Sequence, residues 1–191
     1  EIDASTTVLV KNVAPSNLVI QPIAAIDENG TAVLNLSFDD PGTEDTHDVT
    51  ISWGDGVVET LAVVPGDRTF TTSHQYQQDG DFTINVTVAD DDTGTDDDSV
   101  TVRVVNQAPD LAPLDDQSSD EGSTVDLTGT FTDVGVLDTH TATINWGDGT
   151  TTEAAALLQG DGLGEISGSH IYADDGVYTV TVSVSDDDTT S

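Results

Sequence analysis

The sequence contains no cysteine and no methionine, and its only basic residues besides histidine are Lys11, Arg68 and Arg103. Without cysteine, disulfide bonds, zinc–thiolate sites and thiol catalysis are excluded. The same absence says little about the compartment, because secreted bacterial proteins often lack cysteine too. No apolar run approaches the roughly 18 residues of a membrane span, and no signal-peptide pattern opens the chain. Because it begins with Glu1, we expect a processed product or an excerpt of a longer chain.

Negative charge dominates the composition. Aspartate and glutamate account for 37 residues, which gives a formal net charge of −34. Such a surface repels nucleic acid and anionic membranes, so we exclude both as partners. The negative charge remains compatible with binding of divalent cations, with saline surroundings or with a basic partner. Low hydrophobicity with high charge is also typical of disorder, but the strict alternation of Val, Ile and Thr favours folded strands.

One four-residue motif occurs twice in the same flanking pattern, as Trp-Gly-Asp-Gly at 53–56 and at 146–149. Its glycines tolerate positive φ angles, and its aspartate can accept hydrogen bonds from nearby backbone N–H groups. The motif therefore predicts a core-facing strand that ends in a tight turn. Each tryptophan is in phase with buried positions, which favours a core role over binding of a sugar or cofactor.

Short alternating segments surround both copies of the motif. Leu34, Leu36 and Phe38 share one face of a segment in the first copy, and Val125, Leu127 and Phe131 share one face in the second. Turn residues punctuate the segments, and no helical period of useful length occurs. The sequence therefore predicts an all-β chain of two antiparallel β-sandwiches in tandem.

Seven signals, the tryptophan motif among them, recur in the same order in both halves: Asn-x-Ala-Pro, Phe-x-Asp, Asp-Thr-His, Trp-Gly-Asp-Gly, His-x-Tyr, Asp-Gly-x-aromatic and Val-x-Val-x-Asp-Asp. This combination resembles the PKD (polycystic kidney disease) domain of large bacterial and archaeal surface proteins. The resemblance implies an immunoglobulin-like fold for residues 12–105 and again for 106–191. The two repeats differ at one position of this pattern, where the first has Phe82 and the second has Tyr178. A tyrosine-corner hydroxyl bond is therefore expected only in the second repeat.

Residues 1–11 look like the last strand of a preceding repeat, because Val8 and Val10 occupy the positions of Val102 and Val104. Residues 106–191 include no such strand. Two explanations for this arrangement remain open. The chain is one period of a longer tandem array, or separate subunits are joined head to tail, with residues 5–11 of one acting as a donor strand for the next. Both predict an end-to-end fibre or stalk.

Carboxylates and amides gather at one pole of each predicted sandwich. Two bare carboxylates about 4 Å apart repel by about 4 kcal/mol at an effective dielectric constant of 20, so a converging group needs a counter-charge. Carboxylate and amide oxygens suit Ca²⁺, and some PKD domains are similar in binding Ca²⁺ near this end. The alternative is a solvated acidic face with aspartates as turn residues. The predicted ligands are Asn12, Asp39, Asp40, Asp45 and Asp90 in the first repeat and Asn106, Asp133, Asp138 and Asp186 in the second.

The second predicted site directly follows the last strand of the first repeat, so Ca²⁺ there is expected to stiffen the hinge. The recurrent histidines His47, His74, His140 and His170 favour structural hydrogen bonds over catalysis. No HExxH, GxSxG or Walker motif occurs, and GDGLG at 160–164 fits a hairpin rather than a nucleotide loop.

We therefore expect a non-catalytic, extracellular spacer, adhesin or fibre segment on a cell surface. Its partners would be neighbouring repeats or copies of itself, with a surface glycan or a protein as a further ligand. The alternative is an accessory substrate-binding module of a secreted hydrolase, but few aromatic residues are left over from core positions to form a binding platform.

Overall fold

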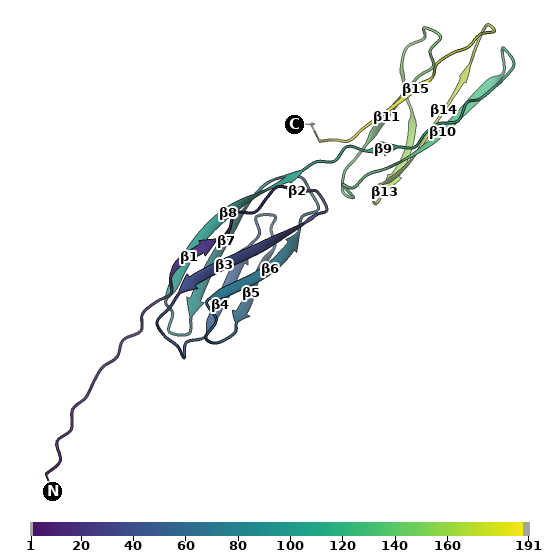
Figure 1. The fold of residues 1–191 in the computed structure, drawn as a ribbon. Coiled ribbons are helices and arrows are strands. Elements are labelled where there is room, and N and C mark those ends of the chain that lie inside the picture. The colour runs from purple at the N-terminus through teal and green to yellow at the C-terminus, as the bar shows by residue number, and fades with distance from the viewer. Residues whose placement is uncertain (1, 189–191) are drawn as a thin grey trace. The chain divides into compact units, whose positions relative to one another are not determined.

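The computed structural model describes residues 2–188, which form strands and contain no helix long and apolar enough to cross a membrane (Figure 1). Two compact units make up the chain. The first comprises residues 1–26, 31–75 and 81–103, and the second comprises residues 27–30, 76–80 and 104–191.

Strands β1 to β8 come from the first repeat and form two sheets, with the orders β1-β3-β6 and β2-β8-β7-β4-β5. Their bounds are β1 (Ser16–Ile20), β2 (Ile26–Asp27), β3 (Thr31–Asp39), β4 (His47–Ser52), β5 (Val58–Val63), β6 (Thr69–Gln75), β7 (Gly80–Asp90) and β8 (Thr95–Val105). Every second residue of the inner strands is buried, as the alternation predicts. On β3 these residues are Ala32, Leu34, Leu36 and Phe38, and on β7 they are Ile84, Val86 and Val88.

Strands β9 to β15 come from the second repeat and also form two sheets, with the orders β13-β14-β10-β9 and β12-β11-β15. Their bounds are β9 (Asp110–Leu111), β10 (Thr124–Thr132), β11 (Thr141–Asn145), β12 (Glu153–Ala154), β13 (Ala156–Gly160), β14 (Leu163–Ile171) and β15 (Thr181–Ser185). The tandem immunoglobulin-like β-sandwich predicted from the sequence is confirmed.

The two repeats differ in the strand that follows the tryptophan turn. In the first repeat β5 pairs only with β4, and a loop separates it from β6. In the second, Asp161 and Gly162 both have positive φ angles, 54° and 71°, and join β13 to β14 by a tight hairpin. A two-residue turn of this kind fixes antiparallel pairing between its flanking strands. The segment that follows the second tryptophan turn is therefore divided into β12, which pairs with β11, and β13, which pairs with β14.

The tryptophan turn has the conformation that its sequence predicts. Gly54 and Gly56 have φ angles of 89° and 99°, and Asp55 Oδ1 accepts a hydrogen bond from the N–H of Val57 at 3.0 Å. A Cβ atom at Gly54 would lie 2.7 Å from the carbonyl oxygen of Thr83, so close backbone approach also requires glycine. The second repeat repeats the positive φ angles and the aspartate bond. Both tryptophans are buried in the core.

The tyrosine-corner bond is present in the second repeat, where the Tyr178 hydroxyl donates to the Asp174 carbonyl at 3.0 Å. Phe82 has no hydroxyl with which to repeat it. Residues 2–15 form no strand, and Val8 and Val10 are 79% and 85% exposed. The assignment of residues 1–11 to a neighbouring repeat, and the boundaries at 12–105 and 106–191, stay predictions.

The long strands β7 and β15 allow a matched test of core packing. Val86 is 1% exposed, whereas its counterpart Val182 is half-buried, because β15 lies at the edge of its sheet. We expect Val86→Ala to cost about 2–3 kcal/mol of stability, and Val182→Ala about 1 kcal/mol or less. Urea unfolding followed by amide NMR signals of each unit measures both. Equal losses would contradict the difference in packing.

Candidate metal centres

In the first unit three carboxylates from separate parts of the chain converge. Asp40 follows β3, Asp45 precedes β4, and Asp90 ends β7. Each offers a carboxylate oxygen, and these oxygens lie within 4.8 Å of one another. We call Asp40, Asp45 and Asp90 the first acidic cluster.

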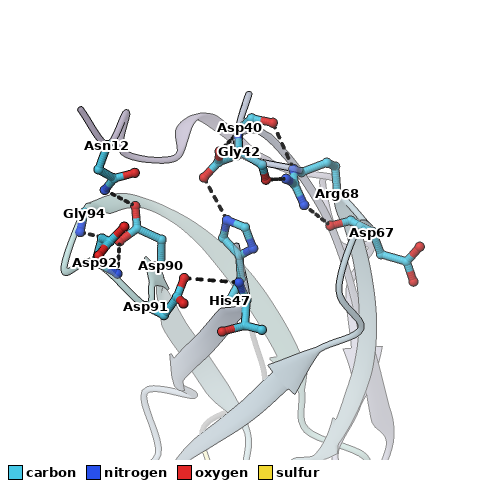
Figure 2. Close-up of polar contacts among 11 residues, drawn as sticks. Asn12, Asp40, Gly42, His47, Asp67, Arg68, Asp90, Asp91, Asp92 and Gly94 are labelled. Carbon is cyan, nitrogen blue, oxygen red and sulfur yellow. Dashed lines mark hydrogen bonds and ion pairs between the residues drawn. The ribbon is translucent and has the colours of Figure 1, made fainter. Parts of the chain in front are cut away.

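Hydrogen bonds fix two of these carboxylates. Asp40 Oδ2 lies 2.8 Å from Nε2 of the buried His47, and its Oδ1 accepts from the N–H of Gly42 at 2.7 Å (Figure 2). Burial raises the pKa of Asp40, but the bonds from His47 and Gly42 outweigh burial and lower it. Asp90 Oδ2 accepts from the Asn12 side-chain amide at 2.9 Å, and its Oδ1 accepts from the N–H groups of Asp92 and Gly94.

Asp45 is the member of the cluster that lacks a compensating charge. Burial raises the pKa of its carboxyl group, and the charges of Asp40 and Asp91 raise it further. A Cβ atom at Gly42 would collide with the Asp45 carboxylate, which explains the glycine at that position. Arg68 stabilises the same loop, because its guanidinium donates to the carbonyl oxygens of Asp40 at 3.2 Å and Gly42 at 2.6 Å (Figure 2).

The two other ligands predicted for the first repeat, Asn12 and Asp39, have different surroundings. Asn12 joins the cluster through its bond to Asp90, with its side-chain oxygen left for another contact. Asp39 is exposed, and its Oδ2 accepts from the Asn17 side chain at 3.0 Å instead. Its side chain alternates to the opposite face of β3 from the buried Phe38, so it does not join the converging oxygens.

The second unit repeats three of these bonds. Asp133 Oδ2 lies 2.8 Å from Nε2 of the buried His140, and its Oδ1 accepts from the N–H of Gly135 at 2.8 Å. The Asn106 side chain donates to Asp186 Oδ2 at 3.3 Å, in the way that Asn12 donates to Asp90. Burial lowers the pKa of His140, but its hydrogen bonds to Asp133 and Gln159 prevail and raise it.

The converging carboxylates of the second unit include a residue that sequence reasoning missed. Glu28, Asp133 and Asp138 each offer an oxygen within 4.8 Å of the others, and we call these three the second acidic cluster. Glu28 is not among the ligands predicted from the sequence, since the residue that its carboxylate contacts, Gln107, is 79 positions away. Burial raises the pKa of Glu28 to about 7, against the effect of the Gln107 N–H, and the charge of Asp138 adds to the rise.

Two further carboxylates were also missed. Asp187 and Asp188 each offer an oxygen close to Asp138, although only Asp186 was selected from the Asp-Asp-Asp run. Asp187 Oδ1 accepts from the Thr139 N–H at 2.7 Å, which lowers the pKa of Asp187. Burial and the charge of Asp79 raise the pKa of Asp188 to about 6.

Three oxygen atoms of the second unit have the character of ligands for a hard cation. Glu28 Oε2, Asn106 Oδ1 and Asp138 Oδ2 are buried and have no hydrogen-bond partner among residues 2–188. Carboxylate and amide oxygens are the ligands that Ca²⁺ prefers, in flexible geometry. The donor set of the second unit therefore has the chemistry that the predicted metal requires.

The other histidines have structural roles of the predicted kind. His74 Nε2 lies 2.6 Å from Asp55 Oδ2, and its ring stacks on Trp53 with centroids 4.9 Å apart. His170 repeats both contacts, with Asp148 at 2.8 Å and Trp146 at 5.0 Å. These pairs tie each tryptophan turn to a strand of the opposite sheet, β6 in the first repeat and β14 in the second.

Comparison with known proteins gives the family. The sequence profile of the PKD domain matches residues 12–105 and 106–191. The chain is similar in fold to a PKD domain of an M14-like peptidase from a Thermoplasmatales archaeon, with 19% identity over 49% of this chain and 98% of that one, and a TM-score of 0.43. It is also similar to a segment of two fibronectin type-III domains of chicken tenascin, with 10% identity over 91% and 99%, and a TM-score of 0.39. No curated protein matches the chain.

The raised pKa of Glu28 predicts how the metal-free protein responds to pH. A carboxyl group whose pKa rises from 4.5 to about 7 on folding binds its proton more tightly in the folded state. Its effect is therefore to reduce stability as the pH rises from 4.5 through 7. In EDTA, we expect the free energy of unfolding of the second unit to fall across this range, and Glu28→Gln to flatten the fall.

Urea unfolding at pH 5, 6, 7 and 8 provides the measurement. Glu153→Gln is the control, since Glu153 is an exposed glutamate of the same unit. If Glu28→Gln and Glu153→Gln keep the same slope as the original chain, Glu28 does not titrate in this range.

Proposed function

The chain belongs to the PKD domain family, and from that premise we propose that it is a non-catalytic extracellular spacer or stalk segment whose sandwiches are stabilised by Ca²⁺ at their acidic poles. PKD domains are typical of extracellular and surface proteins, and no catalytic family is indicated. An adhesive role fits the same class of protein.

The observation that carries the proposal is the repeated bonding framework of the two acidic clusters. Each cluster holds one aspartate against a buried histidine, and in each unit an asparagine bonds to the aspartate that ends or follows the long strand. Each framework also leaves one aspartate, Asp45 or Asp138, with a raised pKa among like charges. A solvated acidic face does not need this degree of fixation, whereas a site for a hard cation does.

Location along the chain supports a stiffening role. Asn106 is the residue that directly follows β8, the last strand of the first repeat. An ion whose ligands include Asn106 would restrict the backbone at that point, which suits a spacer. Extracellular modules bind Ca²⁺ with dissociation constants of about 10⁻⁴–10⁻³ M, so such sites fill only in calcium-rich surroundings.

Calcium addition tests the proposal directly. A ligand at 100 times its dissociation constant stabilises the folded state by about 2.7 kcal/mol. For domains of this size we expect a rise in melting temperature of roughly 10–20 °C between EDTA and saturating Ca²⁺, and a much smaller rise with Mg²⁺. Circular dichroism at matched ionic strength measures both transitions.

Variants of paired residues supply the control. Asp90→Asn and Asp186→Asn change equivalent residues of the two units, and each is expected to reduce the Ca²⁺ response of its own unit. Asp126→Asn changes an exposed strand residue away from both clusters and should leave the response intact. Identical melting in EDTA, Ca²⁺ and Mg²⁺ would reduce the clusters to a solvated acidic surface.

We also propose that repeats of this kind continue end to end through strand pairing. In the first repeat β7 pairs with both β4 and β8, whereas its counterpart β15 lies at a sheet edge and pairs with β11. Residues 5–11 have the pattern of the end of β8, and Val8 and Val10 are exposed. A strand of this sequence would cover β15, whether it comes from a longer array or from another subunit.

Addition of a peptide tests this pairing. A peptide of residues 1–12, supplied in excess, is expected to raise the melting temperature of the second unit and to protect the β15 amides from hydrogen exchange. A peptide with Val8→Asp and Val10→Asp should do neither, because both valines would face the core. Protection by both peptides, or by neither, would rule out the pairing.

A further inference from the structure

Glu28 is a buried carboxylate whose second oxygen has no partner. Its side chain is 1% exposed, and its Oε1 accepts from the backbone N–H of Gln107 at 2.5 Å. Its own N–H donates to the Val105 carbonyl at 3.0 Å, so the backbone is also fixed. Oε2 is buried without a hydrogen-bond partner among the described residues. A buried carboxylate oxygen without a partner is costly, so its position requires an explanation.

The unpartnered oxygen points into the second acidic cluster. A Glu28 carboxylate oxygen lies within 4.8 Å of ligand atoms of Asp133 and Asp138, and Asp138 Oδ2 is also buried without a partner among the described residues. Because Gly135 has no side chain, the Glu28 and Asp138 carboxylates have room to approach each other. A Cβ atom at Gly135 would lie 2.7 Å from Glu28 Oε2. Asp133 is already bonded to Gly135 and His140, and the Gln78 side chain donates to Asp138 Oδ1 at 3.1 Å. Glu28 Oε2 and Asp138 Oδ2 are then the buried carboxylate oxygens of the cluster that lack a partner among the described residues.

No lysine or arginine of the second unit is available to neutralise this pair. The sequence has no lysine or arginine at 27–30, 76–80 or 104–191, which are the segments of that unit. The first acidic cluster differs, because it includes no glutamate and Arg68 bonds to the loop between its aspartates. The two clusters therefore differ in charge, because only the first has an arginine beside its carboxylates.

We propose that Glu28 is a metal ligand that completes the second acidic cluster with Asp133 and Asp138, and that this cluster is the tighter of the two divalent-cation sites. The inference rests on the proposed calcium function and deepens it. Three carboxylates with no lysine or arginine nearby attract a divalent ion more strongly than three carboxylates beside Arg68. Ion binding then depends on residues 27–30, a segment more than 100 positions from Asp133 in the sequence.

Calorimetric titration of the full chain with CaCl₂ at pH 7.5 measures the two sites. The original chain is expected to bind two ions with different affinities. Glu28→Gln should weaken the tighter site tenfold or more and leave the other site unchanged, while Asp45→Asn should do the reverse. Glu153→Gln is the matched control and should change neither site.

The outcomes separate this inference from the proposed function. If the original chain binds no Ca²⁺, both fail. If it binds two ions and Glu28→Gln retains both affinities, the assignment of Glu28 fails while the calcium function stands. Loss of the tighter site in Glu28→Gln alone supports the assignment.

Stability provides a second readout that a purely structural role would not reproduce. With the ion absent, Glu28→Gln removes an unpaired buried charge, so its melting temperature in EDTA is expected to exceed that of the original chain. In saturating Ca²⁺ the order should reverse. Lower stability in both buffers would make Glu28 a structural residue and overturn the proposal. Asp138→Asn, which removes the other uncompensated charge, should show the same reversal if Glu28→Gln does not fold.

Discussion

Charge compensation is the constraint on which the structure depends. With 37 acidic residues and three lysines and arginines, the chain cannot pair its carboxylates with basic side chains. The carboxylates that shape its loops are held instead by backbone N–H groups, amides and histidines. Four aspartates each bond both to a histidine and to a backbone N–H: Asp40, Asp55, Asp133 and Asp148. The two bonds fix the position of the negative charge and also close a loop. Raised pKa values occur at Glu28, Asp45, Asp138 and Asp188, where burial and neighbouring carboxylates outweigh any such donor.

The same framework is completed differently in the two units. Arg68 anchors the loop between Asp40 and Asp45 in the first, and Glu28 meets Asp138 in the second. Their sheets differ in a comparable way, because the Asp161–Gly162 turn draws β13 toward β14 while β5 stays with β4. A duplicated sandwich thus preserves the histidine–aspartate and tryptophan contacts of its core and loops and varies at the residues around them.

Local patterns predicted much of the fold. Alternation identified the buried face of β3, and the Trp-Gly-Asp-Gly motif predicted positive φ angles that the turn adopts. The division of β12 from β13 was not predicted, since it depends on hairpin length rather than on hydrophobic pattern. At the candidate site, Asp40, Asp45, Asp133 and Asp138 were found because they flank strands that end at one pole. Glu28 was missed because its carboxylate meets residues about 80 and 105 positions away, and Asp39 was included although strand alternation turns it outward.

The scarcity of basic residues also determines where trypsin-like proteases can attack. Arg68 is half-buried and donates three hydrogen bonds, and Arg103 lies within β8. Lys11 lies in an exposed segment without strand pairing, so it is the most accessible cleavage point for such enzymes. Cleavage there would detach residues 1–11 and leave both sandwiches whole. If residues 5–11 paired with a neighbouring repeat, the peptide bond after Lys11 would be protected. The strand pairing that joins two repeats would therefore also make the joint resistant to digestion.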